Sequence, residues 1–323
     1  MPVVLFTCAG QRVDMINAFS EAGATTVAVD LDELAPALYA ADRRAVAPRV
    51  DDPGYIPALQ ALVVEHGVDL IVPVADSDHR VLAARRAELS AQVLLSGPAT
   101  INLCEDKYEA HLFFEQHGVP SPGTWAVDDL PEDLPFPVLV KPRRGFGSRH
   151  ISRAEDRDEL AFYLARTVMD SMVQAVCHGE EFSIDLFCDL DGRCLNAIPR
   201  TMIQSKGGES IKGMTIADRE LIEHGARVAE TLGIVGPANV QCFREPDGSL
   251  PVTDVNPRFG GGFPLPTAAG SRFPEVALAL ARGEKPEPRL GEFEAGLVMT
   301  RFFSQTVLRR SGGKLEPLEP PTG

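Results

Sequence analysis

Short apolar runs alternate with longer amphipathic stretches along the N-terminal third of the chain. Strands are predicted at 3–7, 25–29 and 69–74, and helices at 14–22, 55–67 and 79–91. Because strand and helix alternate, a parallel sheet covered by helices is expected. Residues 1–96 therefore predict a small doubly wound, Rossmann-like α/β domain.

After residue 96 the pattern changes to strands joined by tight turns, with fewer helices between them. Helices are predicted near 101–118, 156–167 and 217–232. Asp-Gly dipeptides at 191–192 and 247–248 indicate two hairpins, each with a two-residue turn. A last strand is predicted at 294–308, followed by a tail.

The second of these hairpins concentrates polar side chains on one face. Asp254, Asn256 and Arg258 stand at alternate positions, so they share a face if the segment is a strand. A two-residue turn at 247–248 would set Gln241 directly opposite Asp254. Carboxylate and amide oxygens in such a cluster suit Mg²⁺ that carries a nucleotide phosphate. An ordinary polar hairpin on the solvent face of a sheet is the alternative.

Basic residues gather around a glycine-bearing loop, although the whole chain carries a formal net charge of -15. Between Lys141 and Arg153 there are five lysines and arginines and no acid. Backbone N–H groups near Gly145 and Gly147 can close over phosphates while Lys141 supplies positive charge. Lys107 lies in the first turn of a predicted helix, where the helix dipole favours acids. Exposed, solvated basic residues are the alternative for both features.

The apolar run at 172–176, which includes Gln174 and Val176, could line an adenine slot. Glu181 follows it and could accept hydrogen bonds from ribose hydroxyls. A half-buried meander with a charged outer face is the alternative. Farther along, a cationic loop that begins at Arg200 could hold an acidic group.

Composition limits the partners and the location of the protein. The net charge of -15 argues against a general nucleic-acid surface or an anionic-membrane surface, since both need excess positive charge. No apolar segment reaches the ~20 residues that span a bilayer, so a cytoplasmic location is expected. The six cysteines form no CxxC pair and are expected to be buried free thiols. NAD binding at Gly10 and Asp30 is disfavoured, because only one of the three fingerprint glycines is present.

Several motifs follow one another in a definite order: DK at 106–107, VLVKP at 138–142, GFGS at 145–148, GEEFSID at 179–185, NVQ at 239–241 and DVNPR at 254–258. This order resembles the ATP-grasp superfamily over residues 96–305, and the preceding segment resembles the pre-ATP-grasp domain of those proteins. The glutamine of NVQ and the NPR ending are most similar to the carbamoyl phosphate synthetase large-subunit branch, particularly its short single-copy relatives.

The resemblance implies an α/β fold with a Rossmann-like pre-ATP-grasp domain at 1–96 and an α+β ATP-grasp domain at 97–323. The second domain would comprise a small lid-bearing subdomain at 97–170, a large subdomain with the metal hairpin at 171–310, and a tail at 311–323.

The resemblance also implies a role for each motif residue. Nucleotide binding would fall to Lys107, Lys141, Gly145, Gly147, Ser148, Gln174, Val176 and Glu181. Gln241, Asp254 and Asn256 would hold Mg²⁺, with Mn²⁺ as an alternative ion. Arg258 would stabilise the transferred phosphate, and Arg200 would act with it as a second catalytic residue.

ATP-grasp enzymes usually phosphorylate a carboxylate to an acylphosphate, which an amine then attacks. The resemblance therefore implies an ADP-forming carboxylate–amine ligase for small molecules, with an amino acid or peptide as substrate. It leaves the oligomeric state open, with a homodimer as the candidate assembly. A kinase- or carboxylase-like enzyme and a nucleotide-binding regulatory protein without turnover are the alternatives. Two departures motivate the regulatory alternative: Asp254 replaces the more usual glutamate, and Ala175 stands where glutamate is common.

Overall fold

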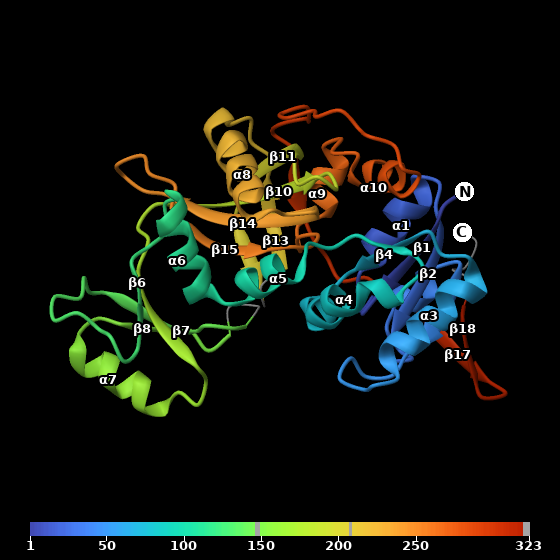
Figure 1. Ribbon diagram of the computed structural model, residues 1–323, viewed down its shortest axis with the longest axis horizontal. Helices are drawn as coiled ribbons and strands as arrows, with labels where there is room; N and C mark the ends of the chain where they lie inside the picture. The colour runs from blue at the N-terminus through green and yellow to red at the C-terminus, as the bar shows by residue number, and fades with distance from the viewer. Residues whose placement is uncertain (146–148, 207–208, 319–323) are drawn as a thin grey trace. The chain divides into compact units, whose positions relative to one another are not determined.

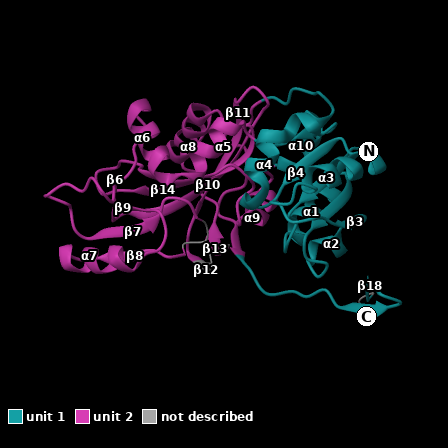
Figure 2. Ribbon diagram, turned by 60° about the horizontal axis from the view of Figure 1, so that its bottom comes forward, with its two compact units in different colours: residues 1–95, 272–287, 300–323 teal, residues 96–271, 288–299 magenta. Residues whose placement is uncertain are grey.

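The computed structural model describes residues 1–145, 149–206 and 209–318. The chain forms two compact units (Figure 2). Unit 1 contains residues 1–95, 272–287 and 300–323, and unit 2 contains residues 96–271 and 288–299. Residues 272–287 thus group with the N-terminal segment, although they are distant from it in sequence. The domain boundaries given above stay predictions.

Unit 1 is built on a five-stranded sheet with the order β3-β2-β1-β4-β5, in which all paired strands are parallel. Its strands are β1 (Val3–Thr7), β2 (Thr25–Asp30), β3 (Arg43–Val46), β4 (Leu70–Pro73) and β5 (Gln92–Val93). β1 and β4 are buried on both faces, as expected for strands of a parallel sheet covered by helices. The predicted doubly wound parallel sheet is confirmed.

Helices pack against this sheet (Figure 1). They are α1 (Val13–Glu21), α2 (Ala37–Ala40), α3 (Tyr55–His66) and α4 (His79–Arg85). Helix α10 (Phe273–Ala281) also belongs to this unit and packs against α1. Short 3₁₀ helices at Asp76–Asp78 and Arg86–Glu88 flank α4. The predicted helices of the N-terminal segment are therefore found, with ends that differ by a few residues.

The loop after β1 is held by the acid at the end of β2. One carboxylate oxygen of Asp30 accepts the N–H of Gly10 at 2.8 Å, and the other accepts the N–H of Asp32 at 2.9 Å. Gly10 has φ of 52°, a conformation that glycine adopts readily. Gly10 and Asp30, whose spacing suggested a dinucleotide fingerprint, therefore hydrogen-bond to each other and hold the loop after β1 against the end of β2.

Unit 2 contains two four-stranded sheets, and the one with the shorter strands has the order β6-β9-β7-β8 and antiparallel pairing. The one with the longer strands is called the larger sheet below. The sheet with the shorter strands consists of β6 (Thr124–Ala126), β7 (Val138–Pro142), β8 (Ser152–Ala154) and β9 (Ser171–Ala175), with helix α7 (Arg157–Arg166) against it. Val138, Val140 and Val173 form its small apolar core with Leu160 of α7. The sheet fixes β7, whose end carries Lys141.

The larger sheet of unit 2 has the antiparallel order β11-β10-β14-β15. Its strands are β10 (Glu180–Cys188), β11 (Cys194–Thr201), β14 (Gly236–Arg244) and β15 (Val252–Asn256). One face is apolar and packs against α8 (Arg219–Leu232) (Figure 1). The opposite face carries polar side chains, among them Asn239, Gln241 and Asp254. Period-two alternation along these strands produces the two faces.

Short elements complete the two units. Helices α5 (Pro98–Glu105), α6 (Lys107–His117) and α9 (Pro264–Ala268) belong to unit 2, with strands β12 (Gln204–Lys206) and β13 (Glu209–Met214). The predicted strand at 294–308 is wrong, since only β16 (Val298–Thr300) and the start of β17 (Leu308–Ser311) are strands there. The tail instead forms a hairpin of β17 with β18 (Lys314–Pro317).

Two global expectations can be compared with the described residues. All six cysteines are free thiols; four are buried, whereas Cys8 and Cys177 are partly accessible. Within residues 1–145, 149–206 and 209–318, no helix has the length and apolar character needed to cross a membrane.

Candidate functional site

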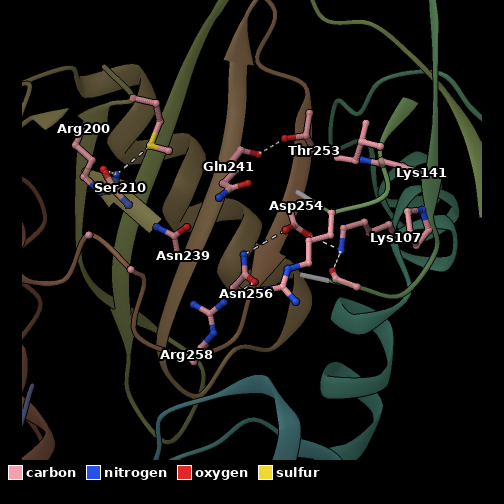
Figure 3. A pocket seen from close by; sticks show the side chains of 17 residues that line it. Lys107, Lys141, Arg200, Ser210, Asn239, Gln241, Thr253, Asp254, Asn256 and Arg258 are labelled. Carbon is pink, nitrogen blue, oxygen red and sulfur yellow. Dashed lines mark hydrogen bonds and ion pairs between the residues drawn. The ribbon is translucent and has the colours of Figure 1, made fainter. Parts of the chain in front are cut away.

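A cavity in unit 2 opens over the polar face of the larger sheet (Figure 3). Eight of the residues predicted from sequence line it: Lys107, Lys141, Gly145, Arg200, Gln241, Asp254, Asn256 and Arg258. They come from α6, from the end of β7 and its loop, and from β11, β14 and β15 with the residues that follow. Segments far apart in sequence therefore converge on one polar cavity.

The hairpin of β14 and β15 places Gln241 opposite Asp254, as predicted. The predicted two-residue turn is nevertheless wrong. The N–H of Glu245 donates to the carbonyl of Ser249 at 3.0 Å and closes a loop over residues 246–248. The longer loop alone would move the pairing by one residue.

A β-bulge between Gln241 and Cys242 restores the register. Cys242 pairs with Val252 and Gln241 pairs with Asp254, so Thr253 is the extra residue. Without the bulge, Gln241 would lie opposite Thr253, and Asp254 would turn to the other face of the sheet. The bulge thus places the acid in the cavity.

Asp254 stands at the centre of a chain of polar contacts. Lys107 Nζ lies 3.3 Å from one carboxylate oxygen of Asp254, and Asn256 Nδ2 lies 3.3 Å from the other. Arg258 Nη2 donates to Asn256 Oδ1 at 3.1 Å. Lys107 Nζ also donates to the carbonyl of Gly145 at 2.9 Å, which joins α6 to the glycine-bearing loop.

The oxygen atoms around Asp254 are of the kind that bind a hard metal ion. Within residues 1–145, 149–206 and 209–318, no group of three or more His, Cys, Asp or Glu side chains could hold a metal by itself. Gln241, Asp254 and Asn256 offer one carboxylate and two amide oxygens on adjacent strands. Such a set fits Mg²⁺, which keeps several waters and is commonly shared between one or two carboxylates and substrate phosphates.

Lys141 is a buried cation beside this cluster, with a side chain only 7% exposed. Burial lowers its pKa to about 8 against the opposing effect of Asp254, with a smaller lowering contribution from the nearby Lys107. The ammonium is costly in this setting unless an anion accompanies it. A phosphate group bound beside Lys141 would supply such an anion.

Part of the basic segment after Lys141 is already neutralised within the protein. Arg143 and Arg144 both pair with Asp106, at 2.9 and 2.7 Å. Asp106 is also the N-cap of α6, where it accepts the N–H groups of Tyr108 and Glu109. These arginines therefore hold the start of α6, and with it Lys107, in place. Their charge is largely balanced by Asp106 and is not left for a ligand.

Arg200 is held from beneath by a buried acid that the sequence reasoning did not assign to the site. Its Nε donates to Asp185 Oδ2 at 2.7 Å, and its Nη1 donates to Ser210 Oγ at 3.0 Å. Asn239 Nδ2 donates to Asp185 Oδ1 and to Ser183 Oγ, both at 2.8 Å. The signal was present, because Ser183 and Asp185 alternate on the same face as Gln241.

Three predicted nucleotide residues do not line this cavity. Gln174 is buried in β9, where its Nε2 donates to Thr124 Oγ1 at 2.9 Å, and it lines a smaller cavity that Lys107 and Asp254 also border. Glu181 is partly buried, and burial raises its pKa, against the opposing effect of Arg200. Val176 lies in the segment between β9 and β10.

Two further predicted residues, Gly147 and Ser148, lie outside the described part of the chain. Their assignment to phosphate binding stays a prediction. Gly145, which precedes them, is described and lines the cavity.

Comparison with known proteins shows which families the two parts of the chain resemble. Residues 167–302 match the family model described as ATP-grasp in the biosynthetic pathway with Ter operon. The chain contains an ATP-grasp domain. Residues 4–94 match the model of the PylC-like N-terminal domain, so the sheet of unit 1 precedes the ATP-grasp domain in the chain. The resemblance stated from the motifs is confirmed.

The carbamoyl phosphate synthase large chain of Clostridium botulinum is 26% identical over 205 residues, which cover 57% of this chain and 19% of that protein. The chain thus spans about a fifth of the length of this curated relative. An L-amino acid ligase from Bacillus licheniformis has a similar structure, with a TM-score of 0.69, 21% identity, and coverage of 87% of this chain and 74% of that one. The structure of a biotin carboxylase complex from Campylobacter jejuni has a TM-score of 0.74 and 15% identity, with coverage of 91% of this chain and 74% of that one. These structures establish the shared fold.

Proposed function

We propose that this protein is an ADP-forming ATP-dependent ligase that joins a small carboxylic acid to an amine. The observation that carries the proposal is the convergence of two lysines, three arginines (Arg149, Arg200 and Arg258) and an oxygen cluster on one cavity. Phosphoryl transfer requires positioning and charge neutralisation more than covalent chemistry, and this set of groups supplies both.

Lys107 and Lys141 bind the phosphates of ATP in the proposed complex. Gln241, Asp254 and Asn256 hold Mg²⁺, which would neutralise charge on the phosphates when bound. Lys107 then exchanges its ion pair with Asp254 for contacts with the nucleotide. Glu181, Gln174 and Val176 complete the nucleoside end in this proposal.

Arg200 orients the carboxylate substrate, and Arg258 stabilises the phosphoryl group in flight. A carboxylate oxygen attacks the γ-phosphorus, and the bond to the β,γ-bridging oxygen breaks, so that ADP leaves and an acylphosphate forms. The amine nitrogen then attacks the acyl carbon, phosphate departs, and the amine loses a proton to give the amide. An amino acid or peptide is the proposed substrate class.

A nucleotide-binding protein without turnover is the second candidate. The ion pair between Lys107 and Asp254 favours it, because the metal-binding carboxylate already has a cationic partner. Substitution Asp254→Asn discriminates between the candidates. Loss of ATP turnover with retained nucleotide affinity would exclude the binding-only protein.

The ligase is tested by measuring ADP release over pairs of carboxylic acids and amines, with ATP and Mg²⁺ present. The expected result is ADP release that requires both members of a pair, together with formation of the amide. Lys141→Ala should lower this rate by about 100-fold or more, since it removes a buried cation from the phosphate site.

Arg153→Ala is the matched control for the loss of a basic residue from the same segment. Arg153 pairs with Glu155 at 2.8 Å and does not line the cavity. ADP release with a carboxylate or bicarbonate alone would contradict the ligase and support a kinase- or carboxylase-like enzyme. Unchanged turnover in Lys141→Ala would contradict the assigned site.

A further inference from the structure

Beneath the cavity lies a buried polar cluster that joins three strands of the larger sheet. Asp185 of β10 is 3% exposed, and its two oxygens have different partners. Oδ2 accepts Nε of Arg200 on β11 at 2.7 Å, and Oδ1 accepts Nδ2 of Asn239 on β14 at 2.8 Å. Arg200 and Asn239 both line the cavity, whereas Asp185 does not.

The glycine-rich segment at 260–262 lies directly over this cluster. A Cβ at Gly260 would stand 2.3 Å from Asp185 Oδ1, and one at Gly262 would stand 2.4 Å from Arg200 Cζ. Both distances are far below van der Waals contact, so side chains at these two positions would displace the ion pair. The segment therefore covers both partners of the pair at once.

We propose that Asp185 is a positioning residue, which holds Arg200 and Asn239 in the orientations in which they face the cavity. A charge-assisted pair with both partners buried fixes the guanidinium more firmly than an exposed pair would. Arg200 Nη1 also donates to Ser210 Oγ at 3.0 Å, so two of the three guanidinium nitrogens of Arg200 are hydrogen-bonded within this cluster. The kinetic consequence of this arrangement rests on the proposed ligase function.

Asp185→Asn removes the negative charge at constant size and is the first variant to test. Asp185→Glu keeps the charge but extends the side chain by a methylene, so it displaces the guanidinium without leaving it unpaired. The second variant decides the outcome if the first does not fold. Asp189→Asn is the matched control, because Asp189 pairs with Arg193 at 3.2 Å beyond the end of β10 and does not line the cavity.

The structural readout is the ¹⁵N–¹H resonance of the Arg200 side-chain Nε–H, assigned by its loss in Arg200→Lys. We expect a slowly exchanging resonance in the native protein and in Asp189→Asn, and its broadening or loss in both Asp185 variants. An unchanged resonance in a folded Asp185 variant would overturn the proposal. This measurement requires no substrate.

The kinetic readout uses the acid and amine pair that gives the fastest ADP release. Both Asp185 variants should raise KM for the carboxylate by about tenfold or more, while KM for ATP stays within about twofold, because a misplaced anchor costs orientation of one substrate. Parallel changes in both KM values would indicate a general structural role and overturn the proposal. If no pair is turned over but the resonance responds as expected, the ligase function fails and the positioning role stands.

Discussion

His224 lies on the buried face of α8, with a side chain that is 1% exposed. Arg227 Nη2 lies 3.2 Å from its Nδ1. Burial and, to a smaller extent, the charge of Arg227 together lower the pKa of His224 to about 4. The imidazole is therefore neutral in the folded protein and takes up a proton on unfolding at mildly acidic pH.

Because the pKa of His224 is lower in the folded state than in the unfolded state, the protein loses stability as the pH falls. Full stability is present above the unfolded value of 6.5, and it is lost as the pH falls from 6.5 toward 4. Protonation of His224 should lower the unfolding free energy by about 3 kcal/mol across that interval. His224→Gln should remove this share of the acid dependence, as measured by urea unfolding between pH 7 and pH 4.5. His178→Gln, at an exposed position, is the control and should leave the slope unchanged.

Residues that line the cavity could be predicted where the local sequence pattern alone marks them. Lys141 and Asp254 stood out because a cation ends an apolar strand and an acid alternates with an amide. Alternation with Ser183 placed Asp185 on the polar face, but its partners Arg200 and Asn239 come from two other strands, so its role could not be inferred from one segment. Likewise, the basic segment suggested a ligand, whereas Asp106 of a distant helix neutralises Arg143 and Arg144.

At the scale of elements, α8 approaches β10 closely enough to require a glycine in mid-helix. A Cβ at Gly225 would lie 2.7 Å from Ile184 Cγ2, on a branched side chain with little freedom to move. Gly225→Ala would gain about 1 kcal/mol of helix propensity but would overpack this contact at a cost of about 1–3 kcal/mol. We expect a net loss of about 1 kcal/mol in unfolding free energy, measured by chemical denaturation.

Gly97→Ala provides the control, because a Cβ at Gly97 would meet no heavy atom within 4 Å. Its unfolding free energy should change by less than about 0.5 kcal/mol. A Gly225→Ala protein more stable than the native one would show that α8 can shift away from the sheet without loss.

The hairpin of β14 and β15 shows what element-level patterns can predict. Alternation fixed which side chains share a face, and the pairing of Gln241 with Asp254 followed correctly. The turn and the bulge were both missed, because a one-residue longer loop and a one-residue bulge cancel in the final register. Strand pattern carries information about faces, whereas bulges depend on contacts with neighbouring strands.

At the scale of the whole molecule, the grouping of distant segments was not predictable from local patterns. Residues 272–287 belong to unit 1, and their helix α10 packs against α1. The apolar pattern of FPEVALALA indicates a buried helix but does not say which core receives it. Homodimer formation and the cytoplasmic location both stay predictions.

The division into two units gives a prediction about nucleotide binding. Every residue that lines the cavity belongs to unit 2. MgATP at about 100 times its Kd should stabilise the protein by roughly 2.7 kcal/mol. Hydrogen exchange followed by mass spectrometry should therefore show slower exchange in peptides from β7, β14 and β15.

Peptides from β1 and β2 of unit 1 serve as the internal control and should exchange at the same rate with and without MgATP. Lys141→Ala should abolish the protection in unit 2, because the phosphates lose their buried cation. Protection confined to unit 1 would place the nucleotide at the edge of the parallel sheet and contradict the site. Equal protection throughout both units would instead indicate that the units unfold together, which would make the nucleotide a stabiliser of the whole chain.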